Sequence, residues 1–218
     1  ADIVTMRIFK AAGLVLLLFV AVYVPGFIVI AGLKLSLKYA VPLLVAITLV
    51  LACFYIWLLT RRSGNFREYG FRFCNPRYLL LAIVLALALG LPLSWLAQRF
   101  ATADPFSGVH FKLWMLVLYF PIAAAIQEEV IFRGLLQTAL TKQLDSALRL
   151  PGNIFTVPVV AIAILFGLIH SGFGIWTVLS AMILGILAGE LRQRSGSLLP
   201  AFVVHAVFNA ASLLWMLV

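Results

Sequence analysis

The chain has 218 residues, of which 65% are apolar and 11% charged, and its mean hydropathy is +1.16. A soluble domain of this size needs a polar shell, so this composition excludes a soluble globular protein. In lipid the backbone must satisfy its own hydrogen bonds, and the long apolar runs without alternation indicate helices rather than a barrel. The sequence therefore predicts an all-α fold, a polytopic transmembrane helical bundle.

Seven apolar runs are long enough to be spans, because about 20 such residues cross a bilayer. Proline predicts a bend near Pro25 in the first run and a kink at Pro121 in the fourth. One domain accounts for all seven. In chain order the predicted spans are Ile8–Leu33, Val41–Leu59, Tyr78–Gln98, Phe111–Lys142, Ile154–His170, Ile175–Leu191 and Leu198–Val218.

Basic residues gather in the loops at one end of this predicted bundle. The segment Arg61–Arg77 has five arginines against one glutamate, and most of the 16 basic residues fall on the same side. By the positive-inside rule the N-terminus is cytoplasmic and the C-terminus outside. The net charge of +9 has the same origin, and without a basic-aromatic stripe we expect no nucleic-acid partner.

Ionisable side chains within spans are costly and indicate function. In the fourth span, Glu129 and Arg133 are four residues apart, share a helix face and are expected to pair. Glu128 is turned about 100° away from Glu129. We interpret Glu129 and Arg133 as a structural ion pair and Glu128 as the carboxylate left for chemistry.

Two further polar groups follow near the ends of later spans. His170 closes the fifth span, where it is either functional or an ordinary interfacial histidine. His205 and Asn209 lie four apart in the seventh span and so share one stripe, where the alternative role is hydrogen bonding between helices. Counting 1.5 Å per residue from the inner loop Gln143–Asn153 places Glu128 and His170 at similar depths. The pattern predicts one buried site.

A buried carboxylate beside imidazoles can activate water as a general base. His170 can hold that water or pass its proton to the leaving amine, while His205 and Asn209 can donate to an oxyanion. This favours peptide hydrolysis without a covalent intermediate, because no serine or cysteine is placed beside a base.

Zinc is the competing chemistry, since Glu128, His170 and His205 match its usual ligands in type. However, the H-E-x-x-H pattern is absent, and Arg133 puts a cation beside the site. We therefore expect no metal and no cofactor, with zinc held by these three residues as the alternative.

At these positions the sequence resembles the CPBP family, also called the type II CAAX prenyl endopeptidase or Abi family. The family pattern is Glu-Glu-x-x-x-Arg, then Phe-x-x-x-His, then His-x-x-x-Asn. In this chain the matching residues are Glu128, Glu129 and Arg133, then Phe166 and His170, then His205 and Asn209. The resemblance covers residues 111–218, the predicted catalytic core, while residues 1–110 carry helices without a family signature in the same integrated membrane domain.

The resemblance implies an intramembrane endopeptidase of the glutamic type, although the family is often labelled metalloprotease. It implies that Glu128 and His170 position the attacking water, and that His205 and Asn209 face the oxyanion. The residues that then hold the catalytic side chains in position are Glu129, Arg133 and Phe166. The partners implied are the lipid bilayer and a membrane-associated protein or peptide substrate.

Other functions stay open at this stage. The same polar cluster could bind a peptide without cutting it, as in a membrane scaffold or immunity protein. A solute transporter is disfavoured because the halves show no matching broken helices. If the site opens outward, a secreted or membrane-anchored precursor is a better substrate than a cytoplasmic CAAX protein. We expect a bacterial or archaeal plasma membrane.

Overall fold

The computed structural model describes residues 3–100, 112–144 and 155–216. Nearly all of this backbone is helical, and six helical stretches within it are long and apolar enough to cross a membrane. The predicted fold class, a polytopic transmembrane helical bundle, is confirmed. The α-helices are α1 Ile3–Leu33, α2 Leu37–Thr60, α3 Pro76–Leu85, α4 Leu91–Arg99, α5 Ala125–Glu129, α6 Gln137–Leu144, α7 Val157–Leu168, α8 Ile175–Ser195 and α9 Leu198–Met216.

Several of these helices join into longer rods through π-helical segments. The third span runs through α3, the segment Ala86–Gly90 and α4. The fourth span runs through Met115–Ala124, α5, Val130–Leu136 and α6. Pro121 lies inside the first π segment of the fourth span and lacks the N–H that a regular α-helical ladder needs. The predicted disturbance at Pro121 is therefore a stretch of wider helix.

The sequence prediction was wrong in detail at the fifth span. The helix there is α7, only 12 residues long, and it ends at Leu168, before His170. The following Ser171–Phe173 form a short 3-10 turn, and Gly174 has φ 100°, so the chain reverses here. α1 continues through Pro25 as one helix. The predicted ends Phe111, Ile154 and Val218 lie outside the described residues.

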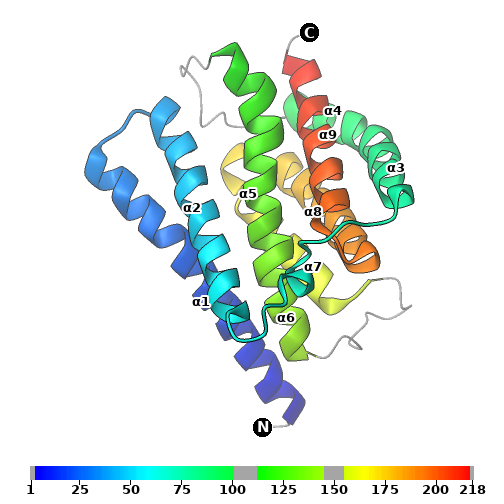
Figure 1. The fold of residues 1–218 in the computed structure, drawn as a ribbon. Helices are drawn as coiled ribbons and strands as arrows, with labels where there is room; N and C mark the ends of the chain where they lie inside the picture. The colour runs from blue at the N-terminus through cyan, green and yellow to red at the C-terminus, as the bar shows by residue number, and fades with distance from the viewer. Residues whose placement is uncertain (1–2, 101–111, 145–154, 217–218) are drawn as a thin grey trace.

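The fourth span is the centre of the bundle (Figure 1). The α1–α2 pair lies on one side of it, and α3, α4, α8 and α9 lie on the other. α9 packs against α3, α4 and α8, and α7 packs against α8. The N-terminus and the C-terminus lie at opposite ends of the bundle. The part of this span that carries Glu129 and Arg133 is therefore held in the protein interior.

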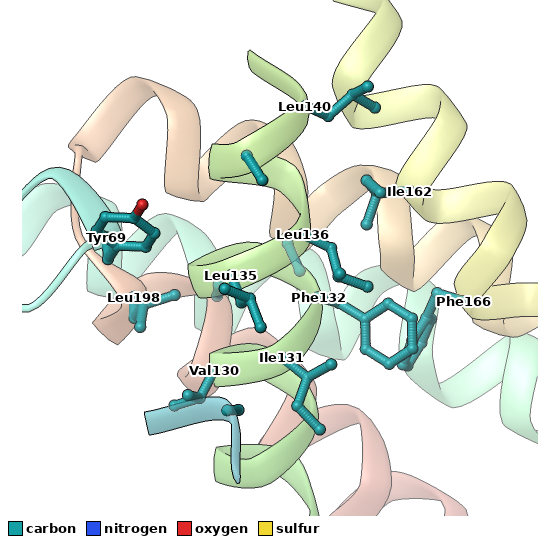
Figure 2. Close-up of a cluster of buried hydrophobic side chains, with 14 of the residues drawn as sticks. Tyr69, Val130, Ile131, Phe132, Leu135, Leu136, Leu140, Ile162, Phe166 and Leu198 are labelled. Atoms are coloured by element: carbon teal, nitrogen blue, oxygen red, sulfur yellow. The ribbon is translucent and has the colours of Figure 1, made fainter. Parts of the chain in front are cut away.

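Side chains of the central helix form most of the core. Every residue of Val130–Leu136 is buried. Phe132 packs edge-on against Phe166 of α7, with ring centroids 5.0 Å apart, while Leu135 lies on the side of Tyr69 and Leu198 (Figure 2). By contrast α1 exposes Leu16, Leu17 and Ile28 by more than 60%, which is what lipid-facing positions require.

α7 and α8 approach closely because small residues meet at their interface. A Cβ atom built on Gly185 would lie 2.9 Å from both Cα and Cβ of Ala163. In membranes, where lipid tails are as apolar as leucine, such close packing is a main source of helix association. Because α7 carries Phe166, this contact also positions the candidate site described below.

Gly185→Ala is expected to lower stability by about 1–3 kcal/mol, since the new methyl group meets backbone that cannot move aside. The measurement is thermal unfolding of the purified protein in detergent. Gly13→Ala is the matched control, because nothing described in the chain lies within 4 Å of its Cβ position. Equal Tm values for the two variants would contradict the close contact.

Candidate functional site

The two glutamates of α5 lie side by side in sequence but in different surroundings. The side chain of Glu129 is 1% exposed, whereas that of Glu128 is 20% exposed. α5 is a single α-helical turn between two π-helical segments, so its backbone is fixed on both sides by the central span. Of the two carboxylates, Glu128 is the one that a water molecule or substrate can reach.

Glu129 is bound by two partners from different elements. Its Oε1 accepts from Nη1 of Arg133 at 3.0 Å, as the four-residue spacing predicted, and lies 2.7 Å from Nδ1 of His205. A carboxylate can only accept, so Nδ1 of His205 carries the proton and donates. Arg133 is fully buried and His205 is 3% exposed. The contact between Glu129 and His205 thus ties the central helix to α9.

His205 also faces the second glutamate. Its Nε2 lies 3.6 Å from Oε2 of Glu128, which is ion-pair distance but too long for a direct hydrogen bond. The imidazole therefore bridges the buried carboxylate and the accessible one. The two contacts of His205 bring the first and third sequence motifs together, although Glu129 and His205 are 76 positions apart in the chain.

The charges of this cluster balance only with one additional proton. Glu128 and Glu129 supply two negative charges and Arg133 supplies one positive charge. An unbalanced charge in an apolar interior is costly. A proton on His205, adjacent to Glu128, makes the four groups neutral. The arrangement thus places an imidazole that can exchange protons next to the accessible carboxylate, which is the basic requirement for acid–base chemistry.

Phe166 links the second motif to the other two. Its ring lies 4.5 Å from the guanidinium carbon of Arg133 and 5.6 Å, edge-on, from the ring of His205. It also contacts the ring of His170 at 4.9 Å, and its carbonyl oxygen is 2.7 Å from Nδ1 of that histidine. Phe166 thus packs against three of the predicted site residues and is itself 1% exposed.

The remaining predicted residues lie at the edge of this cluster. His170 is partly buried, and within the described chain its hydrogen bond is to Phe166 rather than to Glu128. With Nδ1 engaged, its Nε2 is the atom available to a substrate or water. Asn209 is one helical turn beyond His205, and its amide donates to the carbonyl of Phe120 at 3.3 Å. The two residues flank the cluster without joining its ion pairs.

The sequence analysis missed groups near Glu128 that come from outside the three motifs. Tyr23 of α1 accepts a hydrogen bond from Nε2 of Gln127 at 3.4 Å and lies within electrostatic range of Glu128. Tyr119 of the central span also lies within electrostatic range of Glu128, and its hydroxyl donates to the carbonyl of Val41. A tyrosine in an apolar run is an ordinary residue, so no sequence signal marked either one.

A zinc ion does not fit the cluster as it is arranged here. Across the described residues, no three His, Cys, Asp or Glu side chains are close enough together to hold a metal ion. Glu128 and His205 are adjacent, but Nδ1 of His170 is directed at the Phe166 carbonyl. Glu129 is already engaged by Arg133 and His205. No chemical step is therefore derived through zinc.

Arg133→Met is expected to destabilise the protein by about 3–5 kcal/mol, because it leaves the buried charge of Glu129 without its cation. Unfolding by denaturant in detergent micelles measures this loss. Adding Glu129→Gln removes the stranded charge, so the double variant should be more stable than Arg133→Met alone. Wild-type stability in the single variant would show that the ion pair does not hold the helices together.

Comparisons with known proteins found one match, to a family model, in the second half of the chain. Residues 109–211 match a family model described as Type II CAAX prenyl endopeptidase Rce1-like. No curated protein and no solved structure matches the chain. The matched residues include all seven motif positions and end two residues beyond Asn209. The predicted family resemblance is confirmed for this part of the chain, and the six apolar helices support an integral membrane protein.

Proposed function

We propose that this chain, whose residues 109–211 match the family model described as Type II CAAX prenyl endopeptidase Rce1-like, is an intramembrane endopeptidase of the glutamic type. Glu128 activates a water molecule, and this water hydrolyses a peptide bond of a membrane-associated protein or peptide precursor. The observation that carries the proposal is the contact between the accessible Glu128 and the buried pair formed by His205 and Glu129.

The charge distribution supports Glu128 as the base. In the resting state the negative charge of Glu128 lies beside the proton on His205. When Glu128 takes a proton from the attacking water, negative charge develops on the carbonyl oxygen of the substrate. Nε2–H of His205 can then donate to that oxyanion. The four groups and the oxyanion together stay neutral, so the apolar surroundings do not oppose the step.

The other motif residues take supporting parts in this scheme. His170 holds the attacking water together with Glu128 through its available Nε2. Asn209 turns its amide from the Phe120 carbonyl to the oxyanion. Protonated Glu128 gives its proton to the leaving amine as the intermediate collapses. Glu129, Arg133 and Phe166 keep His205 in one orientation, because Nδ1 is fixed by the buried carboxylate and the ring by the aromatic contact.

The orientation of the bundle indicates from which side of the membrane the substrate reaches the site. The arginine-rich segment Arg61–Arg77 begins at the end of α2 that lies toward the N-terminal end of the bundle, and it contacts the turn that follows α8. We place this end in the cytoplasm under the positive-inside rule. His170 and the turn after α7 then lie toward the outside, which favours a secreted or membrane-anchored precursor as substrate.

Glu128→Gln is expected to lower peptide-bond cleavage at least about 1,000-fold, because an amide cannot accept the proton of the attacking water. The assay incubates proteoliposomes with a farnesylated CAAX peptide and, separately, with bacterial membrane protein extract, and detects new peptide ends by mass spectrometry. In H₂¹⁸O, one ¹⁸O atom should enter each new carboxyl end.

Glu190→Gln is the matched control, since Glu190 pairs with Arg194 at the end of α8, away from the cluster. It should cleave like the wild type, and both variants should show wild-type yield and Tm. Undiminished cleavage by the Glu128→Gln variant would show that Glu128 is not the general base. Absence of any cleavage by wild-type protein on both substrate sets would favour the peptide-binding scaffold.

Cleavage is expected to survive chelation. Treatment with 1,10-phenanthroline and then EDTA, followed by metal analysis of the same sample, should leave the rate within about twofold of the untreated protein, because the proposed base is a carboxylate and not a metal-bound hydroxide. A loss of activity that stoichiometric zinc restores would instead assign Glu128, His170 and His205 as zinc ligands.

A further inference from the structure

The loop between α2 and α3 is fastened to the turn between α8 and α9. Nε of Arg72 donates to the carbonyl of Gly196 at 2.8 Å, and the hydroxyl of Ser197 donates to the carbonyl of Arg72. The backbone N–H of Leu198 donates to the carbonyl of Gly70 at 3.0 Å. Residues from the two halves of the chain therefore form one surface at this end of the bundle.

This surface contains a pocket of about 470 Å³. Three arginines line it: Arg67 and Arg72 from the loop and Arg192 from α8. Gln193 and Glu68 are also in its wall. Within the described part of the chain, none of the three arginines forms an ion pair with a carboxylate. The pocket therefore concentrates positive charge that the protein itself does not neutralise.

Arg192 is the buried member of the three. It is 8% exposed, its Nη2 donates to the backbone carbonyl of Glu68 at 2.7 Å, and its Nε is buried without a partner among the described residues. A guanidinium has five N–H donors, so most of its capacity is unused. Gly70, at φ 91°, leaves it room, because a Cβ there would lie 2.6 Å from Nε. The fold thus accommodates a cation that lacks an anion.

The carboxylate in the pocket wall does not supply this anion. Lys142 at the end of α6 bonds to Glu68 and lowers the pKa of its carboxyl group, and Asn65 donates to the same carboxylate at 2.6 Å. Glu68 is therefore ionised at neutral pH, and its charge is balanced by Lys142. The positive charges of Arg67, Arg72 and Arg192 remain for an external ligand.

Exposed aromatic side chains precede and follow Arg72 in the same loop. Phe73 is 92% exposed and Phe71 is 44% exposed. Large apolar side chains next to arginines are typical of a segment that lies on a membrane, where rings insert among the acyl chains and cations meet headgroups. The loop also directly follows α2, which spans the membrane to Thr60.

We propose that this pocket binds the phosphate of an anionic phospholipid headgroup, with Arg67 and Arg192 as its main ligands. Guanidinium groups form charge-assisted, bidentate hydrogen bonds with phosphate oxygens. The site is separate from the candidate catalytic cluster, because His205 lies seven residues along α9 from Leu198, about 10 Å at 1.5 Å per residue. The proposal therefore does not depend on the protease activity.

Binding is measured as the shift in Tm of the purified full chain in detergent on titration with dioctanoyl phosphatidylglycerol. Dioctanoyl phosphatidylcholine, with the same acyl chains, and inorganic phosphate are separate arms. We expect a saturable rise in Tm with phosphatidylglycerol and little change in the other two arms. Arg67→Gln should weaken the apparent affinity about 10-fold, as the loss of one charge-assisted contact predicts.

Arg62→Gln is the matched control, since it removes the same charge from an exposed position near the pocket but outside its wall. The side chain of Arg67 makes no hydrogen bond or ion pair within the described chain, so its replacement should not affect folding. Equal weakening by both variants, or equal shifts with the two lipids, would overturn the site. Equal protection by inorganic phosphate would overturn the lipid headgroup as its ligand and assign the pocket to soluble phosphate.

Discussion

A carboxylate in the interior of a membrane is stable only where protein groups replace its hydration. Oε1 of Glu129 satisfies this condition by accepting from Arg133 in its own helix and from His205 in α9, whereas Oε2 is buried without a partner among the described residues. The two contacts couple the central span to the last span at a fixed register, and they set the orientation of the imidazole. Everything proposed for Glu128 depends on this, because its neighbour His205 is held in place from the opposite side.

The first two sequence motifs each combine buried residues with a more accessible one. Glu129 and Arg133 support while Glu128 is accessible, and Phe166 supports while His170 lies at the edge of the cluster. The buried residues also pack against one another, because the ring of Phe166 contacts both the Arg133 guanidinium and His205. This division explains why an apolar bundle can hold four ionisable groups without losing its stability.

Hydropathy and helical spacing were sufficient to predict the spans, the Glu129–Arg133 pair and the separate character of Glu128. They could not predict that α7 stops at Leu168, because a glycine-rich turn after a continuous apolar run determines that end. They also could not show Tyr23 beside Gln127, since contacts between distant helices leave no local pattern. The same reason hid the arginine pocket, whose wall joins residues more than 120 positions apart.

The most direct test of the central claim is a crystal structure of the protein grown in a lipidic mesophase, with ordered water visible. The account predicts that Oε2 of Glu128 lies within about 4 Å of Nε2 of His205, the cutoff for an ion pair, with a water molecule in contact with both. Glu128 directed into lipid, or distant from both His170 and His205, would contradict it, since no group would then be placed to activate water.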